Sequence, residues 1–320
     1  MKHVFVFDPR AFRNQQWKMD NILDNIGQFF RTQDKPNFSI QFSRYRRHAI
    51  GIIQSEMEKM ETEDIVRVYA VGGEEILFDC INGVAHFSNI QLAAVPYGES
   101  SDFLSIFGKE NMESFRDIPL LVESNALSTD IIKWGINYTL NSCYIGMNSI
   151  LSKNLKSIKT SVNKGVFIIF SKLSSFINYI LTSFDKNVVA RKYKIEIDDV
   201  DYTGHYSLIH IANGPYYAGK MTGASDAVPN DGFFNVALIK SSYALRTMLS
   251  LAMYSRGKRP GNCVYLQAKK ITVQSDNQMW IQLDNEYIQD TKISLDLIHH
   301  GVEIVTANNL SYPSASAAVQ

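Results

Sequence analysis

Two glycines stand between a predicted strand and a predicted helix, an arrangement that can bind phosphate. Gly72-Gly73 follows the apolar run Ile65–Val71 and precedes a helical run that begins at Glu74 and ends near Ile81, where Asn82-Gly83 close it. Glycines let a ligand approach the backbone, and unpaired N–H groups at a helix N-terminus attract anions. The local pattern fits two interpretations: a phosphate-binding turn, or a turn that only redirects the chain.

Two further turns place carboxylates after predicted strands. Pro96–Phe103 follows the strand Leu92–Val95; its Gly98 permits an unusual backbone angle, and its Asp102 either serves a ligand or caps the next helix. Asp284-Asn285 follows the strand Met279–Leu283 and is a hairpin-turn signal. Each pattern fits both a binding site and an ordinary turn.

The elements that would position these turns alternate between strand and helix over the first hundred residues. They are expected in the order His3–Phe7, Gln15–Arg31, Phe38–Phe42, 49–60, Ile65–Val71, Glu74–Ile81 and Leu92–Val95. Such alternation is typical of a parallel α/β sheet covered by helices. Ligands bind to these sheets at the carboxyl ends of the strands, where the glycine turns lie.

After about Arg116 the pattern changes to short strand-like runs with two helical interruptions. The runs are Thr139–Ile145, Lys192–Ile197, Ser207–Ala212, Phe233–Ile239, Lys270–Val273 and Met279–Leu283, and the helices are Lys164–Phe184 and Ala244–Arg256. We therefore expect an α/β domain over residues 1–118, a mostly β domain over residues 119–310 and an unfolded tail over residues 311–320.

The overall composition narrows the class of protein and its partners. Lys and Arg total 32 and Asp and Glu total 32, so the chain lacks the basic excess typical of nucleic-acid binding. Three distant cysteines show no CxxC spacing, which favours a reducing compartment without disulfides or a zinc site. The most apolar stretch, Val166–Phe184, contains Lys172 and Asn178 and is not expected to span a membrane. We expect a cytoplasmic protein that binds no nucleic acid.

The first glycine turn and the helix after it resemble a known family motif. Val71–Val84 reads VGGEEILFDCINGV, which is similar to the GGDGTxNEVxNGL motif of the diacylglycerol kinase catalytic domain family. Pro96–Phe103 resembles the PxGTxNDFA motif of that family at the expected distance. The likeness extends to other segments along nearly the whole chain: Val4–Pro9, Asn141–Gly146, Asn213-Gly214, Asp231-Gly232 and Asp284–Glu286. The family includes bacterial lipid kinases and sphingosine and ceramide kinases.

The resemblance implies an α/β N-terminal nucleotide-binding domain, a C-terminal β-sandwich and an active cleft between them. The implied reaction is transfer of the ATP γ-phosphoryl group to a lipid hydroxyl, assisted by Mg²⁺. Asp284 would then be the catalytic general base, and Glu74 and Asp102 would be metal ligands. The residues that we expect to contact the nucleotide are Asp8, Arg47, Gly72, Gly73, Glu74, Gly98 and Asp102.

The nucleotide loops depart from the family motifs mainly by gaining negative charge. Glu74 replaces Asp, Glu75 replaces Gly and Ile76 replaces Thr in the first motif. Glu99 and Ser101 replace Thr and Asn in the second. Two like charges ~4 Å apart repel by about 1 kcal/mol in water and about 4 kcal/mol at an effective dielectric of 20. The added carboxylates would therefore oppose a polyphosphate.

Two interpretations of these carboxylates stay open. Nearby cations could offset them: Arg10, Arg13, Arg44, Arg46 and Arg47. Alternatively, Glu74 and Glu75 only stabilise their helix N-terminus and point into solvent. His299-His300 shows no carboxylate or cysteine at ligand spacing, so we expect no metal site there.

The sequence therefore supports two functions. The first is a lipid kinase that uses ATP and Mg²⁺, acts on a diacylglycerol-like or sphingoid lipid, and makes transient contact with a membrane surface. The second is a non-catalytic relative that binds a lipid or another ligand and has lost ATP binding. A polar stripe on the predicted helix Lys164–Phe184 is a candidate lining for a lipid cleft: Ser171, Ser175, Asn178 and Thr182.

Overall fold

A computed structural model of the protein describes residues 1–13, 15–33, 37–60, 64–97, 101–146, 191–217 and 221–313. Some expectations lie outside these residues: the helix Lys164–Phe184 with its polar stripe, the turn residues Gly98 and Glu99, and positions 314–320 of the tail. Every strand that we expect in the first hundred residues is among the described elements.

The N-terminal part contains a parallel sheet in the order β4–β3–β1–β2, as the strand–helix alternation predicts. Its strands are β1 (Lys2–Phe7), β2 (Phe38–Phe42), β3 (Val66–Gly72) and β4 (Ile90–Pro96). β3 is buried along its whole length, which suits the nearly continuous apolar sequence of a strand covered on both faces. The carboxyl ends of these strands lead into the predicted binding turns.

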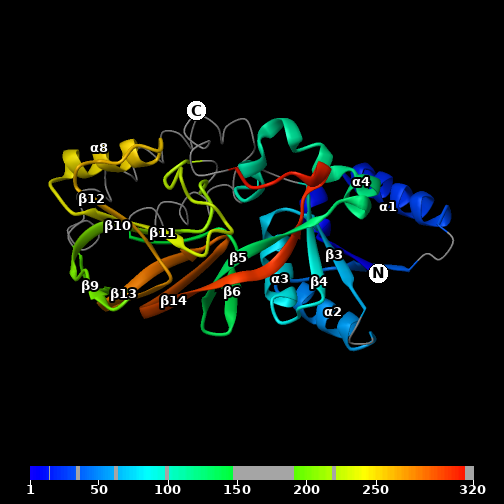
Figure 1. Cartoon of the computed structure of the whole chain (residues 1–320), viewed down its shortest axis with the longest axis horizontal. Helices are drawn as coiled ribbons and strands as arrows, with labels where there is room; N and C mark the ends of the chain where they lie inside the picture. Colours follow the sequence, from blue (N-terminus) through cyan, green and yellow to red (C-terminus); the bar gives the residue numbers. More distant parts are fainter. Residues whose placement is uncertain are drawn as a thin grey trace.

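Helices cover both faces of this sheet (Figure 1). α1 (Gln16–Arg31) and the short α4 (Ile118–Glu123) lie on one face, and α2 (His48–Met57) and α3 (Glu74–Val84) lie on the other. On the α1 face, the ring of Phe30 packs 5.9 Å from that of Phe5 between centroids. Single 3-10 turns complete this part: η1 (Pro9–Phe12), η2 (Leu104–Phe107), η3 (Lys109–Asn111) and η4 (Ser114–Arg116).

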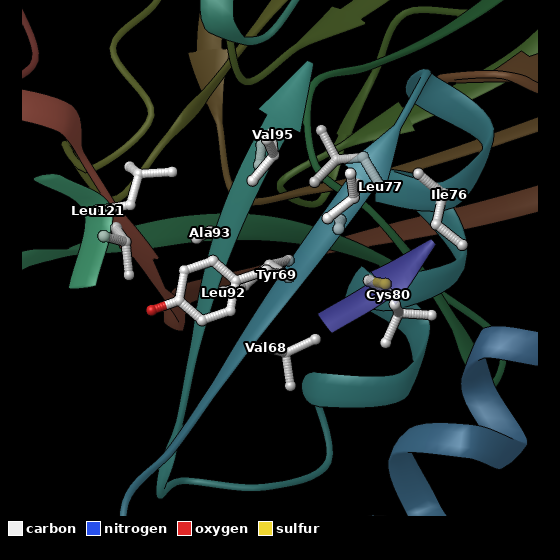
Figure 2. Packing of buried hydrophobic residues seen from close by; sticks show 14 of the residues in the cluster. Val68, Tyr69, Ile76, Leu77, Cys80, Leu92, Ala93, Val95 and Leu121 are labelled. Atoms are coloured by element: carbon white, nitrogen blue, oxygen red, sulfur yellow. The ribbon is translucent and has the colours of Figure 1, made fainter. Parts of the chain in front are cut away.

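Helix α3 is longer than the sequence predicts, because it continues through Asn82-Gly83 to Val84. A Cβ atom at Gly83 would lie 2.7 Å from Cδ1 of Ile53 in α2. The missing side chain therefore lets the two helices pack closely, and the expectation that Asn82-Gly83 close the helix is wrong. Figure 2 shows Ile76 and Cys80 of α3 among the buried side chains beside β3 and β4.

The C-terminal part consists mostly of antiparallel strands in the order β12–β11–β10–β7–β13–β14, with β5, β6, β8 and β9 paired to them. Their bounds are β5 (Ala126–Trp134), β6 (Asn137–Thr139), β7 (Ser142–Gly146), β8 (Lys192–Ile197), β9 (Val200–Asp201), β10 (Gly204–Ala212), β11 (Phe234–Lys240), β12 (Cys263–Ala268), β13 (Lys270–Leu283) and β14 (Glu286–Val305). α8 (Ala244–Tyr254) and η5 (Ala307–Asn309) are its described helices. An α/β part followed by a mostly β part confirms the predicted fold class.

Strand β14 joins the two parts into one sheet. Its end pairs in parallel with β4, so that Ile304 lies opposite Leu92, while its earlier residues pair with β13 and β5. Figure 1 shows β14, in orange and red, running from the β half into the α/β half. The domain bounds at residues 118 and 310 stay a prediction. Across the described residues, no helix has both the length and the apolar character needed to cross a bilayer.

A bulge in β14 places two histidines beside a buried carboxylate. Asp130 on β5 lies opposite this bulge, where the register of the two strands shifts. Its carboxylate pairs with His299 Nδ1 at 2.7 Å and accepts the N–H groups of His300 and Gly232, each at 2.8 Å. The carboxylate partner that the local sequence does not offer thus comes from a distant strand. Because Gly232, His299 and His300 all bond to its carboxylate, we assign Asp130 a structural role, which is to hold β14 and the Gly232 turn against β5.

Candidate functional site

One pocket brings together carboxylates from three sequence motifs. Glu74 at the start of α3, Asp102 from the turn after β4 and Asp284 from the β13–β14 hairpin all line it. The pocket is small, with a cavity volume of about 30 Å³, and it opens to solvent. Most of its other walls are apolar, and the remaining lining residues are Leu77, Phe78, Ile81, Phe103, Leu140, Asn141, Ser142 and Tyr144. This lining combines polar groups that can orient a ligand with apolar surface.

Asp284 occupies the predicted hairpin turn, and the backbone holds its carboxylate in place. The residue adopts a left-handed conformation with φ of 45°. Its Oδ1 accepts the N–H groups of Asn141 at 3.0 Å and Ser142 at 2.8 Å, and its Oδ2 accepts the N–H of Leu140 at 2.7 Å. Burial raises the pKa of Asp284, while these amides act in the opposite direction. The turn thus fixes a carboxylate at the pocket wall.

Glu74 and Asp102 form the acidic pair on the other side of the pocket. The Glu74 carboxylate accepts the backbone N–H of Asp102, so the α3 start and the turn after β4 are joined. Burial raises the pKa of Tyr287 to about 12, and the negative charge of Glu74 adds to this. Carboxylate oxygens are the ligands that Mg²⁺ prefers, so this donor set fits a magnesium ion.

The diglycine turn has the shape that the sequence predicts, but Ile76 in the helix after it does not have the role of the family's hydroxyl residue. A Cβ at Gly72 would lie 3.0 Å from Ile76 Cγ2 and 3.1 Å from Asp8 Cβ, which explains the need for glycine there. Gly73 stands at the N-cap of α3. Both glycines line a second, smaller pocket that also contains Glu74. Ile76 is buried in the core, so it fills space where the family motif has a hydroxyl (Figure 2).

Ser101 takes over the capping role that the sequence offers to Asp102. Its Oγ accepts the N–H of Leu104 at 3.3 Å at the start of η2. Asp102 instead faces the pocket beside Glu74. The interpretation of Asp102 as a helix cap is therefore wrong, and its place in the pocket is compatible with the predicted metal role. Gly98 lies outside the described residues.

Arg10 is bound to the protein's own carboxylates. Its Nε lies 2.8 Å from Oδ1 of Asp8, and its Nη2 lies 3.2 Å from Oδ2 of Asp8 and 3.9 Å from Oε2 of Glu75. The hydrogen bond to Asp8 raises the pKa of Arg10. Asp8 lies close to Gly72 but does not line the three-carboxylate pocket, so its contact with a nucleotide stays a prediction.

Two arginines at the start of α2 connect the two parts of the molecule. The backbone N–H of Arg47 donates to Asp79 at 2.7 Å, and its guanidinium donates to Asn137 at 2.6 Å. Arg46 forms an ion pair with Glu286, just after the β13–β14 turn. The structure thus places Arg47 outside the pocket, on contacts that hold α2 and α3 against the β part.

Sequence reasoning missed three residues that carry these connections: Asn82, Asn137 and Glu286. The Asn82 side chain donates to the carbonyl of Tyr138 at 2.9 Å and accepts its N–H at 2.8 Å. Asn82 and Glu286 both lie within the family-like motifs, and their positions in these motifs could have identified them as important. Nothing in the sequence around Asn137 marks it.

Because the carboxyl group of Asp79 is buried, we expect the stability of the folded protein to depend on pH. Burial raises its pKa from 3.8 to about 6, although the N–H and charge of Arg47 lower it. The folded protein therefore holds this proton more tightly than the unfolded chain, and stability falls as pH rises from 3.8 to about 6. We expect Asp79→Asn to gain in Tm relative to wild type across this window, measured by calorimetry. The exposed Asp20→Asn is the control, and a constant Tm difference for Asp79→Asn would contradict the prediction.

Comparisons with known proteins agree with this arrangement. Residues 159–306 match the family model described as "YegS C-terminal NAD kinase beta sandwich-like domain". Two Staphylococcus aureus proteins, from strains JH9 and N315 and each named "Putative lipid kinase", are 24% identical to this chain over 313 residues. The matches cover 93% of this chain and 97% of each relative. The resemblance to the diacylglycerol kinase family is confirmed.

Solved structures extend the likeness to the diacylglycerol kinase fold. A protein of Bacillus anthracis strain Sterne, described as "A putative diacylglycerol kinase", matches with a TM-score of 0.72 and 18% identity. A structure of a diacylglycerol kinase from the same strain matches with a TM-score of 0.67 and 17% identity. Each comparison covers 97% of this chain and 98% of the other. The chain therefore has the two-part diacylglycerol kinase fold over nearly its whole length.

Proposed function

We propose that the protein is a lipid kinase that transfers the ATP γ-phosphoryl group to a lipid hydroxyl in the three-carboxylate pocket. The observation that carries this proposal is the meeting of Glu74, Asp102 and Asp284 in one apolar-walled pocket. These residues come from motifs that are far apart in the sequence. Carboxylates that can hold Mg²⁺ and accept a proton, next to apolar side chains, support phosphoryl transfer to a lipid alcohol.

Each carboxylate has a role in this proposal. Glu74 and Asp102 would hold Mg²⁺, which would neutralise charge on the phosphate groups when bound. Asp284 would accept the proton of the lipid hydroxyl while that oxygen forms its bond to the γ-phosphorus and the bond to ADP breaks. The amides of residues 140–142 would keep the Asp284 carboxylate aimed during this transfer.

The apolar wall supports a lipid as acceptor. Phe78 and Ile81 on α3 and Phe103 after β4 line the same pocket as the carboxylates. Their side chains offer contact to hydrocarbon and reduce access of water to the reacting groups. The acceptor class that we propose is a diacylglycerol-like or sphingoid lipid.

Specific observations favour a second function, a lipid-binding relative that has lost ATP binding. The Asp284 oxygens already accept three backbone N–H groups. Arg10 is held by Asp8, which lies beside Gly72, and it also lies near Glu75. The first feature leaves Asp284 less able to accept a proton, and the second leaves less positive charge for a triphosphate.

A pair of thermal-shift measurements and a transfer assay separate the two functions. We expect Mg·ATP at ~100 Kd to stabilise the full chain by about 2.7 kcal/mol, and labelled phosphate to appear in a diacylglycerol or sphingoid acceptor. Mg·ADP serves as the control that binds without transferring. A shift with lipid but none with Mg·ATP, together with no labelled lipid, would establish the second function instead.

A further inference from the structure

Helix α8 presents an apolar stripe to solvent. Leu245, Leu249 and Met253 recur every four residues on its outer side and are 63%, 58% and 41% exposed. Tyr243, directly before the helix, is 68% exposed. Residues four apart lie on the same side of a helix, so these side chains form one continuous patch. Contiguous exposed apolar surface of this kind marks an interaction site more often than scattered single residues do.

The inner side of α8 combines two hydroxyl side chains with Leu251 and Tyr254. Thr247 and Ser250 face the protein, where their hydroxyls bond to the Ser242 carbonyl at 3.2 Å and to Asn262 at 2.8 Å. Tyr254 is also buried, and its hydroxyl pairs with His210 Nδ1 at 2.7 Å. A helix that packs in water normally buries its leucines and exposes its hydroxyls. Helix α8 buries Leu251 but leaves Leu245 and Leu249 exposed, so its outer side offers apolar surface for a second contact.

The side chains around this stripe are positively charged, which favours a negatively charged partner. Residues 241–262 contain four basic side chains and no acidic one: Arg246, Arg256, Lys258 and Arg259. Arg259 is paired with Asp226, and the other three are exposed. Apolar side chains on a helix with cations beside them are typical of segments that lie in the interface of a negatively charged bilayer.

We propose that α8 docks the protein on an anionic lipid bilayer, with Tyr243, Leu245, Leu249 and Met253 entering the interface. The proposal deepens the proposed function and rests on it, since a lipid acceptor has to be taken from a membrane. Figure 1 shows α8 on the outside of the β half, above β10 and β12.

The inner side of α8 is connected to the pocket wall. Leu251 and Tyr254 pack in one buried cluster with Tyr144, which also lines the three-carboxylate pocket. The buried cluster under the docking helix therefore extends to the wall of the site. Docking through α8 would hold the pocket at a fixed height above the bilayer surface.

Vesicle co-sedimentation without nucleotide tests the docking helix. Wild-type protein is expected to bind vesicles of equal parts phosphatidylcholine and phosphatidylglycerol, and to bind phosphatidylcholine vesicles more weakly. The double variant Leu245→Gln/Leu249→Gln keeps helix propensity and should lose about tenfold or more in vesicle affinity. Arg246→Gln and Arg256→Gln should each cost about fivefold on the anionic vesicles. Ile136→Gln, at a position 84% exposed on the β5–β6 turn, is the matched control and should bind like wild type.

Several results would overturn the docking proposal. Wild-type protein that fails to bind the anionic vesicles, or a leucine double variant that binds as wild type does, would each refute it. A change of sedimenting mass in the double variant without lipid would assign the stripe to a second copy of the chain instead. Transfer to a short-chain, water-soluble acceptor should be equal in wild type and double variant. Vesicle binding without any transfer would refute the proposed function and leave the docking helix in place.

Discussion

Replacing Asp284 by Asn is expected to lower phosphoryl transfer by about 10³-fold. An amide cannot accept the proton of the lipid hydroxyl, and a positioned general base contributes about 10²–10⁴-fold to such reactions. In wild type the rate should rise with pH as the Asp284 carboxyl ionises. Because burial raises its pKa, the midpoint should lie above the ordinary value of 3.8, and the residual rate of the variant should lack this step. Initial rates across a pH series, well below the Tm of each protein, measure both effects.

The hydrogen bonds of Asp284 give this variant a second, structural effect. Both of its oxygens accept backbone N–H groups, so the amide NH₂ of Asn has to face one of these donors. Losing such a bond and leaving a buried N–H unpaired costs about 1–3 kcal/mol, which calorimetry would record as a lower Tm.

A matched variant separates chemistry from hairpin damage. Glu286→Gln removes a carboxylate from the same hairpin and breaks its pair with Arg46 at a position that does not line the pocket. Its transfer rate should stay within a few-fold of wild type. Equal losses in the two variants, or an active Asp284→Asn protein, would remove Asp284 from its role as base.

Local patterns in the sequence predict much of the α/β part. The continuous apolar run of β3 and the helical spacing of α1 act through neighbouring residues, and both elements lie where the periodicity places them. The end of α3 is mispredicted, because Gly83 is kept inside the helix by contact with Ile53 of α2. That contact joins elements about thirty residues apart, and no local window contains it.

Partners from distant strands account for most of what the sequence does not predict. β14 reaches from the hairpin at Asp284 to a parallel pairing with β4, and this brings Glu286 to Arg46 and His299 to Asp130. The alternation of β14 identifies a strand but not its neighbours. The motif resemblance succeeds where local patterns fail, since it places Asp284 near Asp102 without any knowledge of the pairing.

Charge at the start of α3 gives the second large prediction: Glu75→Gln should bind Mg·ATP about thirtyfold more tightly than wild type. Its carboxylate, on a half-exposed side chain, stands in the first turn of the helix that should receive the phosphates. Removing a like charge at ~4 Å relieves between about 1 and about 4 kcal/mol of repulsion, and a middle value of about 2 kcal/mol corresponds to this factor. The change also leaves Arg10, 3.9 Å from Glu75, with less competing negative charge. Calorimetric titration of both proteins with Mg·ATP measures the ratio.

The same substitution should lower stability while it raises affinity. A negative charge near a helix N-terminus contributes about 0.3–1 kcal/mol, so Glu75→Gln should melt slightly earlier than wild type without ligand. Glu58→Gln, at the C-terminal end of α2, removes an exposed charge away from the turn and should leave the ATP affinity unchanged. If Glu75→Gln binds Mg·ATP no better than wild type, repulsion at this turn is not what limits the nucleotide. If neither protein binds Mg·ATP, the charge of Glu75 is not the cause, and replacement of the motif hydroxyl by Ile76 and the lipid-binding alternative are favoured.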